Sequence, residues 1–377
     1  MSHKRLLILS FSHIASDARV LKQVRHFAAT MDVTTCGYGP APIEGVEHVT
    51  LDGVSTSRSW TRRDIAFRRF KKIYWNTPAV VEAKSRLASR GQFDVILAND
   101  VETVGLALAL SPVSGVHADI HEYAPRQNEE IVMWRIFNAP YITWMCRRFL
   151  HKTSSMTTVG TGIATEYEKQ FGVTPDVATN AAPFANLEPG TVGSPIRLVH
   201  SGAAHRNRHL EILIEAAECT GSSVTLDLFL VPSDPAYLAE LGRLAASTSN
   251  VRVMPPVPYA ELLAKLNEYD VGLHVIPPTN FNNRWALPNK FFDYVQARLG
   301  LIVGPSPEMA RLLEDHNLGS VTDDFSVGAL TRTLDRLTRD EVAKWKDASH
   351  MSASSLSAEA QVLVWDRAIS RILASGE

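Results

Sequence analysis

The sequence predicts an α/β protein of two doubly wound domains. Three observations support this fold class: a length of 377 residues, apolar strand-like runs that alternate with helix-like segments, and a restart of that alternation after a Pro- and Gly-rich stretch. The chain is too long for one ordinary core, and two domains of roughly 150 to 190 residues are expected. Such domains bind ligands at the carboxyl ends of parallel strands, so we expect them to face a central cleft.

The first domain opens with a strand, a loop and a helix. Residues 5–11, RLLILSF, form an apolar run of strand length, and Val20, Val24 and Phe27 follow at helical spacing. Further strand-like runs are VTTCGY, DVILAND, VHADIH and SMTTVG, with helical patterns between several of them. These runs predict a Rossmann-like N-terminal domain over residues 1–185.

The second domain repeats the pattern after a linker. Residues 186–195 lie in a segment that is poor in periodicity and rich in Pro and Gly, as interdomain linkers are. The strand-like runs that follow are IRLVHSG, VTLDLFLV, VRVMPP, VGLHVIP and LGLIVG. They predict a second Rossmann-like domain over residues 196–352. Residues 353–377 predict a terminal helix, capped by Ser355 or Ser357, that crosses back to pack near the N-terminal domain.

Composition narrows the classes of function. Apolar residues at 45% and charged residues at 21% are typical of a globular protein. The net charge of -2 divides into 21 Lys+Arg against 18 Asp+Glu up to residue 190, and 17 against 22 after it. The halves are therefore +3 and -5, which argues against a nucleic-acid partner but permits a basic patch on the first half.

Neither a membrane span nor a cysteine-based site is expected. No apolar run reaches the roughly eighteen residues that span a bilayer, and the N-terminal run is too short for a signal peptide, so the sequence predicts a cytoplasmic location. Cys36, Cys146 and Cys219 are far apart and lack metal-ligand spacing. They are expected to be free thiols in the cores.

The most specific motif lies in residues 286–319, ALPNKFFDYVQARLGLIVGPSPEMARLLEDHNLG, where a proline and a cation open a helix that leads into a strand. It resembles the donor-binding signature PNKxxEYxAxGxPVI of glycosyltransferase family 4, whose members are retaining GT-B enzymes that use nucleoside-diphosphate sugars. The resemblance implies that Lys290 is catalytic and neutralises the diphosphate, that Asp293 binds the ribose hydroxyls, and that Leu287 belongs to the donor site. A solvated helix lysine is the alternative for Lys290.

A second motif, residues 198–217, is similar to the strand–GxxxxxRGLexLIeA segment of the same family. Arg208 falls on the matching arginine, so the resemblance implies a catalytic, diphosphate-binding cation there. Gly202 and Ala203 are small residues that let the backbone approach the donor, and Arg206 is a weaker second cation.

Two motifs of the first domain indicate the acceptor side. The segment SFSHIASDARVLKQVRHFA resembles the D-x-R-V opening of many bacterial members, which implies that Asp17, Arg19 and His13 bind the acceptor, although Asp17 can equally cap the helix. The segment ADIHEYAPR resembles a D-x-H-E strand end that faces the cleft. It implies a catalytic His121 nearest the anomeric carbon and an acceptor-binding Glu122, with a structural histidine as the alternative.

One departure concerns the donor sugar. Family members commonly carry a glutamate eight positions before the residue that matches Asp293, and this chain has Trp285 there. The contact with the sugar would then fall to Asn282, Asn283 or Arg284, and Asn283 is our assignment. No metal, cofactor or dedicated nucleophile is expected, since the leaving phosphate assists the acceptor in such enzymes and the chain lacks a DxD-like pair.

Residues 57–75, SRSWTRRDIAFRRFKKIYW, interleave basic and aromatic side chains. Such a segment can lie in the headgroup layer at the inner face of a membrane or receive a polyprenyl-phosphate acceptor. An ordinary amphipathic surface helix gives the same pattern, so both interpretations stay open. Residues 133–152 are interpreted as a core helix with a solvated end.

The leading hypothesis is a hexosyltransferase-type retaining enzyme that moves a sugar from a nucleotide sugar to a hydroxyl of a glycan, lipid-linked or cell-envelope acceptor. Two alternatives remain: a catalytically silent GT-B protein that binds a nucleotide or a partner, and a nucleotide-sugar epimerase.

Overall fold

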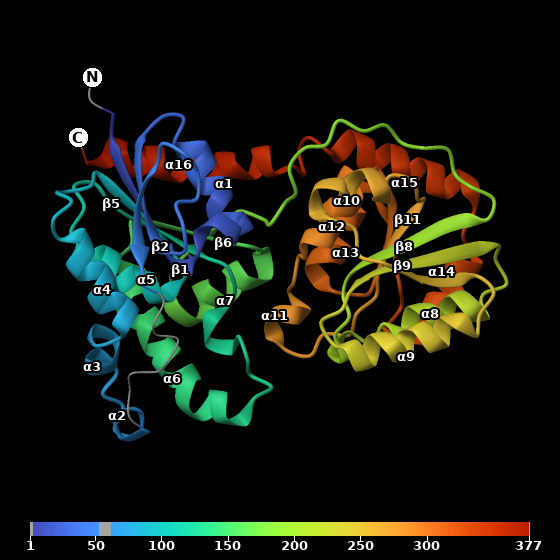
Figure 1. Cartoon of the computed structure of the whole chain (residues 1–377), viewed down its shortest axis with the longest axis horizontal. Coiled ribbons are helices and arrows are strands. Elements are labelled where there is room, and N and C mark those ends of the chain that lie inside the picture. The colour runs from blue at the N-terminus through green and yellow to red at the C-terminus, as the bar shows by residue number, and fades with distance from the viewer. Residues whose placement is uncertain (1–2, 53–61, 377) are drawn as a thin grey trace. The chain divides into compact units, whose positions relative to one another are not determined.

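The computed structural model describes residues 3–52 and 62–376, which divide into two compact units (Figure 1). The first unit comprises Met1–Thr179, Asn280–Asn282 and Gln361–Glu377. The second comprises Asn180–Thr279 and Asn283–Ala360. In the described part of the chain, no helix is long and apolar enough to cross a membrane.

The first unit contains a seven-stranded sheet in the order β3-β2-β1-β4-β5-β6-β7, and all of its strand pairs are parallel. The strands are β1 Arg5–His13, β2 Asp32–Tyr38, β3 Glu47–Leu51, β4 Val95–Asn99, β5 Gly115–Ile120, β6 Ser155–Thr158 and β7 Asp176–Val177. Because β1 lies between β2 and β4, the chain winds outward from β1 in both directions, as a doubly wound sheet does.

Helices and short 3-10 turns connect these strands. The helices are α1 Ala18–Phe27, α2 Arg62–Ala66, α3 Phe70–Trp75, α4 Pro78–Leu87, α5 Val101–Ala109, α6 Val132–Phe149, α7 Thr161–Phe171 and, from the end of the chain, α16 Ala358–Ser375. Asp17 ends the loop after β1 and caps α1, accepting hydrogen bonds from the backbone N–H groups of Arg19 and Val20.

The core of the first unit contains residues from both ends of the sequence. Leu6, Ile8, Val95 and Leu97 of the central strands are fully buried, and α16 packs Trp365, Ile369 and Ile372 in the same cluster. Ser357 Oγ accepts a hydrogen bond from the N–H of Ala360 at the start of α16, which is one of the two predicted caps.

The second unit contains a six-stranded parallel sheet in the order β10-β9-β8-β11-β12-β13. Its strands are β8 Ile196–Ala203, β9 Val224–Val231, β10 Val251–Met254, β11 Val271–His274, β12 Gly300–Val303 and β13 Gly319–Val321. Its helices are α8 Glu211–Cys219, α9 Pro235–Ala246, α10 Tyr259–Leu266, α12 Asn289–Gln296, α13 Pro307–His316, α14 Val327–Asp335 and α15 Arg339–Ser352, and α11 Phe281–Arg284 is divided between the two units.

The predicted fold class is confirmed: each unit is an α/β layer structure around a parallel sheet. The apolar runs 5–11, VHADIH and LGLIVG lie in β1, β5 and β12, because strands covered on both faces require uninterrupted apolar sequence.

Candidate functional site

The second unit holds a cavity of about 220 Å³ at the carboxyl ends of β8, β11 and β12. This edge is where parallel sheets of this type bind their ligands. Its lining residues are His205, Asn207, Arg208, His274, Ile276, Pro277, Asn283, Ala286, Pro288, Lys290, Ser306 and Met309.

Two of the predicted cations converge on one backbone position. Gly202, near the end of β8, has a φ of +155°, and a Cβ at this residue would lie 2.3 Å from Lys290 Cε and 3.5 Å from Arg208 Nη1. A side chain at residue 202 would force Lys290 to shift, and the positive φ favours glycine there. The sequence motifs that contain Arg208 and Lys290, 82 positions apart (290 − 208), therefore meet at this point.

The two cations are close enough to repel each other. Burial and the neighbouring charge of Arg208 lower the pKa of Lys290 to about 8, although Asp293 partly opposes this shift. Burial also lowers the pKa of Arg208. Neither side chain forms an ion pair within residues 180–360, all of which the structure describes. Two partly desolvated cations that repel each other form a site that an anion stabilises.

Local sequence explains how Lys290 reaches this position. Pro288 is the N-cap of α12, so Lys290 lies in the first turn of the helix, where free backbone N–H groups favour an anion. Tyr294 fixes the helix against the sheet: its hydroxyl accepts a hydrogen bond from the N–H of Ser201 at 3.2 Å, and its ring packs over Gly272, where a Cβ would lie 2.4 Å away. A side chain at residue 272 would displace α12 and its lysine.

Asp293 lies one helical turn after Lys290 on α12. The spacing of three residues places both side chains on one face of the helix, and the carboxylate raises the pKa of the lysine by its charge. Asp293 is only 3% exposed and also raises the pKa of Tyr259 through its charge, after the larger effect of burial. The charge of Asp293 therefore acts on Lys290 and on Tyr259, the first residue of α10.

The other predicted donor residues take different positions. Asn283 lines the cavity and donates a hydrogen bond to Thr279 Oγ1 at 2.6 Å. Ala203 is the last residue of β8, adjacent to Gly202. Leu287 is buried in the apolar cluster of the second unit and does not line the cavity. Its side chain supports the segment before α12 instead of contacting the space beside the cations.

Two histidines of this site were not predicted from the sequence. His274 ends β11 and lines the cavity, and the ring of the buried His200 lies 6.3 Å from it at an interplanar angle of 26°. Burial and the charge of Lys290 lower both pKa values, that of His200 to about 3, so both rings are neutral near pH 7. The signal available in the sequence was a histidine in each of two apolar strands, in LVHSG and in GLHVIP.

The first unit carries a separate pocket of about 210 Å³ at the ends of β4 and β5. Its lining residues are Asp100, Glu102, His121, Glu122, Ala124 and Gln127, so two predicted residues, His121 and Glu122, share it. Nδ1 of His121 lies 3.5 Å from Asp100, and Nε2 lies 3.5 Å from Asp119. Burial disfavours the imidazolium, but these carboxylates outweigh burial and raise the pKa of His121.

Asp100 was missed by the sequence analysis. It follows β4 with φ 62° and ψ 156°, a conformation that costs a residue with a side chain on the order of 1–3 kcal/mol. The strained backbone directs its carboxylate to the N–H and ring of His121. A carboxylate directly after a buried strand, in ANDVE, was the available signal.

Arg19 is a buried structural residue, contrary to the predicted contact with an acceptor. Its Nε and Nη2 donate to the two carboxylate oxygens of Asp119 at 2.8 and 2.7 Å, and Nη1 donates to the carbonyl of Ala178. Its guanidinium also lies 4.8 Å from the ring of Trp365. Asp119 also lies 3.5 Å from Nε2 of His121, so Arg19 positions the carboxylate that His121 contacts. The guanidinium itself is buried.

The loop after β1 holds the two remaining predicted acceptor residues. Asp17 caps α1 and also accepts a hydrogen bond from Ser12 Oγ at 2.8 Å. His13 is exposed, with its ring 5.9 Å from that of Tyr38. The structural alternative for Asp17 is thus observed, and a role toward an acceptor stays a prediction for both residues.

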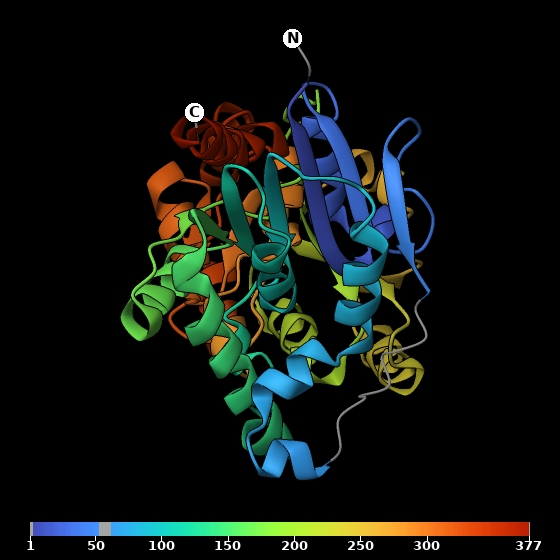
Figure 2. The same ribbon diagram turned by 90° about the vertical axis from the view of Figure 1, so that its left-hand side faces the viewer.

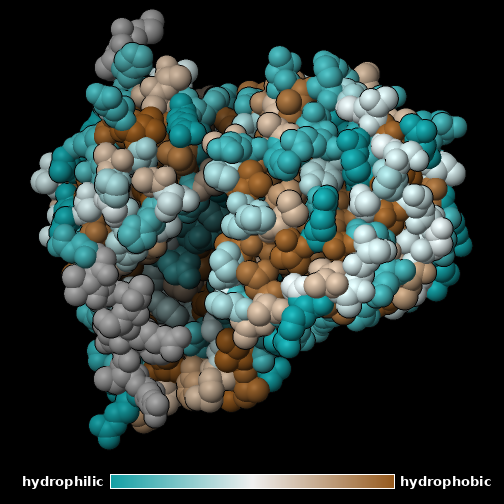
Figure 3. All heavy atoms as spheres, turned by 45° about the vertical axis from the view of Figure 1, so that its right-hand side comes forward, coloured by the Kyte–Doolittle hydropathy of each residue, from teal (hydrophilic) through white to brown (hydrophobic). Residues whose placement is uncertain are grey.

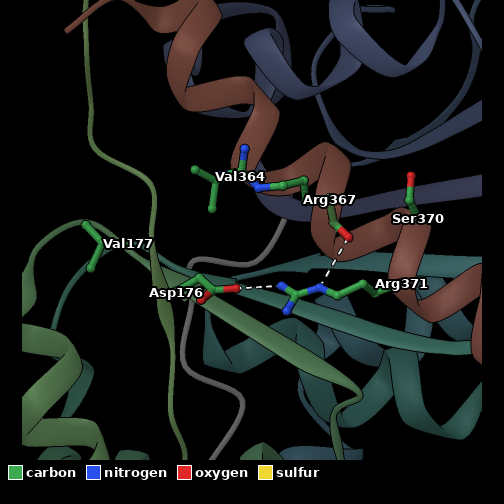
Figure 4. A pocket seen from close by; sticks show the side chains of 6 residues that line it. All are labelled: Asp176, Val177, Val364, Arg367, Ser370 and Arg371. Carbon is green, nitrogen blue, oxygen red and sulfur yellow. Dashed lines mark hydrogen bonds and ion pairs between the residues drawn. The ribbon is translucent and has the colours of Figure 1, made fainter. Parts of the chain in front are cut away.

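Another groove of the first unit, about 520 Å³ in volume, lies between β7 and α16 (Figure 4). Arg371 pairs with Asp176 at 2.7 Å across it, and its Nε donates to the carbonyl of Arg367. The charge of Arg371 is balanced inside the groove, unlike the charges beside Gly202. No predicted site residue lines this groove.

Comparisons with known proteins identify the fold. The sequence matches no protein-family profile and no curated protein sequence. Among solved structures, HepE from Anabaena in complex with UDP and glucose is similar, with 12% identity, 98% of this chain and 100% of that chain covered, and a TM-score of 0.70. Sucrose-phosphate synthase from Thermosynechococcus elongatus has 13% identity, coverage of 99% and 100%, and a TM-score of 0.71.

The lipopolysaccharide outer core galactosyltransferase WaaB has 12% identity to this chain, with coverage of 97% and 99% and a TM-score of 0.66. At these identities the similarity establishes the fold: the chain has the GT-B architecture of these proteins over nearly its whole length.

Proposed function

We propose that the protein is a retaining glycosyltransferase of the hexosyltransferase type, which transfers a sugar from a nucleoside diphosphate to a hydroxyl of a glycan, lipid-linked or cell-envelope acceptor. The observation that carries the proposal is the convergence of Arg208 and Lys290 beside Gly202, at the carboxyl end of β8. A pyrophosphate is the anion that such a pair of cations fits.

The cations act on the leaving group. As the bond from the sugar to the diphosphate breaks, negative charge grows on the phosphate oxygens, and two fixed, partly desolvated cations stabilise it. The free N–H groups at the start of α12 add to this field. Asp293 accepts hydrogen bonds from the ribose hydroxyls, and Asn283 contacts the sugar. His274, a neutral ring beside Lys290, offers a hydrogen bond without adding repulsion between cations.

The acceptor side is formed by the first unit. His121, whose pKa is raised so that a larger fraction of molecules carries its charge, is our catalytic assignment in this unit, and Glu122 in the same pocket is our assignment for acceptor binding. Asp17 and His13 contribute from the loop after β1. The leaving phosphate assists removal of the acceptor proton, so the reaction requires no metal and no cofactor. Full activity in the presence of EDTA is the expected outcome.

The solved structures support a uridine nucleotide as the first donor to test. HepE is described in complexes with UDP, with UDP and glucose, and with UDP-glucose. WaaB, named as a galactosyltransferase of the lipopolysaccharide outer core, supports a cell-envelope glycan as acceptor. The proposed place of action is the cytoplasmic side of the cell envelope.

A donor assay tests the function. UDP-, GDP- and dTDP-sugars are incubated with the protein, with and without glycan acceptors, and release of the nucleoside diphosphate is measured. We expect Lys290→Ala and Arg208→Ala each to lower the rate by about 10²- to 10³-fold, the usual cost of removing a fixed group that stabilises transition-state charge. Their folds should be intact by circular dichroism.

Arg206→Ala is the matched control. Arg206 is two residues from Arg208 but pairs with Glu240 and is more than half exposed, so its loss should change the rate by less than about threefold. Wild-type rates in both Lys290→Ala and Arg208→Ala would contradict the proposal that these two cations bind the diphosphate.

Two alternative functions stay open, and Trp285 bears on the first of them. It replaces the carboxylate expected eight positions before Asp293, and the guanidinium of Arg284 lies 6.0 Å from its ring. A catalytically silent GT-B protein would bind UDP, detected as a rise in melting temperature, yet release none from any donor. An epimerase would change the sugar of the donor without an acceptor, which chromatography of the nucleotide sugar detects.

A further inference from the structure

One end of the first unit exposes large apolar side chains. Figures 1 and 2 show α2, α3 and the start of α6 at this end, and in Figure 3 hydrophobic side chains gather there. Five side chains in this region are half exposed or more: Phe67 at 70%, Ile131 at 51%, Val132 at 55%, Met133 at 61% and Ile136 at 55%. Several large apolar side chains exposed on neighbouring elements of one unit indicate an interaction surface.

The exposure follows from how α6 is divided between two faces. Trp134 is buried, and Phe137, Tyr141 and Trp144 of α6 pack against an apolar cluster from α2 and α3. That cluster consists of Ile65, Phe70 and Ile73. The packed face holds α2, α3 and α6 together as one surface, and Val132, Met133 and Ile136 at the start of α6 stay exposed. α6 thus has buried residues along its length and exposed apolar side chains at its start, whereas the sequence predicted a core helix with a solvated end.

Cations outnumber carboxylates on these elements. Residues 63–75 and 129–149 contain eight Lys and Arg residues against three carboxylates, Asp64, Glu129 and Glu130. Asp64 pairs with Lys72 at 3.2 Å and with Arg69 at 3.8 Å. A groove of about 420 Å³ opens on the same surface. Its lining residues are Arg68, Phe70, Arg135, Ala139, Pro140, Thr143, Trp144 and Arg147. Three guanidinium groups around an apolar floor fit a phosphate that is attached to an apolar body.

We propose that residues 63–75 together with residues 131–147, the α2–α6 face, dock on a bilayer that contains anionic phospholipids. The apolar side chains at the start of α6 and Phe67 enter the boundary between headgroups and acyl chains, and the cations contact the headgroup phosphates. This inference goes beyond the proposed glycosyl transfer and does not depend on it. The sequence indicated residues 57–75 as a possible membrane contact, and residues 57–61 of that segment lie outside the described residues. The start of α6 was not part of that prediction and is added here from the structure.

A bilayer fits this face better than a nucleic acid does. Nucleic-acid surfaces combine cations with aromatic side chains on which bases stack. Here the exposed side chains are mainly aliphatic, and the aromatic rings Phe70, Tyr141 and Trp144 are engaged with one another, with centroids 5.7 to 6.2 Å apart. Aliphatic residues ringed by Arg and Lys are the composition of an interfacial membrane surface.

Cosedimentation with lipid vesicles tests the proposal with the full chain. The protein is mixed with vesicles of phosphatidylcholine alone and with vesicles that contain about 30% phosphatidylglycerol, and the bound fraction is measured by pelleting. We expect binding to the anionic vesicles only. It should fall when salt is raised from about 0.1 M to about 1 M, because the screening length drops from about 10 Å to about 3 Å.

Paired variants separate this face from the general surface. Met133→Glu and Ile136→Glu should each lower the partition coefficient at least about tenfold, because a carboxylate replaces an inserted apolar group. Met351→Glu, at an 81% exposed position on α15, is the matched control and should change it less than about twofold. Arg135→Ser should cost about fivefold, as one cation near an anionic surface does, whereas Arg243→Ser on α9 should cost little.

Three outcomes would overturn the proposal. The first is wild-type protein that stays in the supernatant with anionic vesicles. The second is equal binding of Met133→Glu and Met351→Glu. The third is a dimer of the wild-type protein, seen without lipid and abolished by Met133→Glu, which would assign the face to a second copy of the chain. All substituted side chains are exposed, so unchanged melting temperatures should accompany each result.

Discussion

At the scale of single residues, the buried cations beside Gly202 lower the stability of the ligand-free protein. The pKa of Lys290 is about 8 because burial and then Arg208 disfavour its ammonium form. The folded-state pKa is lower than that of an unfolded chain, so the unfolded state retains the proton to higher pH. Ligand-free stability should therefore rise as the pH increases from about 8 toward the ordinary lysine pKa, and a bound diphosphate should remove this penalty.

The same pKa predicts how nucleotide affinity depends on pH. Only the ammonium form of Lys290 attracts a diphosphate, and raising the pH through about 8 removes that charge. We expect the Kd for UDP to increase about tenfold between about pH 7 and pH 9, which calorimetric titration measures.

Lys290→Arg provides the control, because a guanidinium keeps its charge over this range. Its affinity for UDP should be nearly constant with pH. A wild-type affinity that does not change between these two pH values would contradict a direct contact between Lys290 and the diphosphate.

The sequence predicts the roles of some site residues better than those of others. Arg208 and Lys290 stand at fixed places in two motifs, and the structure brings them to one point. Arg19 also stands in a motif, yet its guanidinium donates hydrogen bonds to Asp119, 100 positions away. No local sequence pattern reveals that Asp119 is buried beside it. Asp100 and His274 were missed for the same reason: their importance comes from neighbours on adjacent strands.

At the scale of elements, the ends of helices carry the candidate chemistry. Asp17 satisfies two N–H groups at the start of α1, whereas α12, which the structure describes in full, begins without a side-chain cap, and Lys290 in its first turn lies beside Gly202 near the end of β8. Strands and most helices could be predicted because apolar runs and helical periodicity are local properties. The first turn of α6 could not, since its exposure depends on which face the α2 and α3 cluster covers.

Asp17 offers a test of whether a helix cap also binds an acceptor. Asp17→Ser keeps a side-chain oxygen that accepts from the backbone of α1, whereas Asp17→Ala removes it. We expect Asp17→Ala to lower the free energy of unfolding by about 1 kcal/mol and Asp17→Ser to lower it by only a few tenths of that, measured by urea unfolding.

Activity distinguishes the two roles. If Asp17 binds the acceptor, Asp17→Ser should raise the acceptor KM at least about tenfold while stability is kept. An unchanged KM in Asp17→Ser would limit this residue to its cap.

At the scale of the whole molecule, the path of the chain couples distant parts of the sequence. Residues 361–377 follow the second unit in sequence but complete the core of the first, where Trp365 is 1% exposed against Arg19 and the sheet. The terminal helix could be predicted from its periodicity, because apolar residues recur at helical spacing. Its partner could not be derived from that periodicity alone, since spacing does not identify the surface that a helix covers.

Trp365→Ala should destabilise the first unit selectively. Removing a fully buried indole costs about 3–5 kcal/mol, and it also exposes the Arg19 and Asp119 pair. Hydrogen exchange should show lost protection in β1 and β4, with protection in β8 and β9 nearly unchanged. Leu363→Ala, at a 49% exposed position on the same helix, should leave both sheets as they are. Equal loss of protection in both units would contradict selective packing of α16.

The route of α16 also bears on synthesis at the ribosome. When residues 5–179 have left the exit tunnel, the seven strands of the first unit are present. The part of its core that α16 contributes, Trp365, Ile369 and Ile372, is not yet synthesised or exposed. The second unit, whose residues run from 180 to 360 apart from a short excursion, can close its sheet before the last helix emerges. The nascent chain should therefore mature in reverse order, with the later unit reaching its native fold before the earlier one.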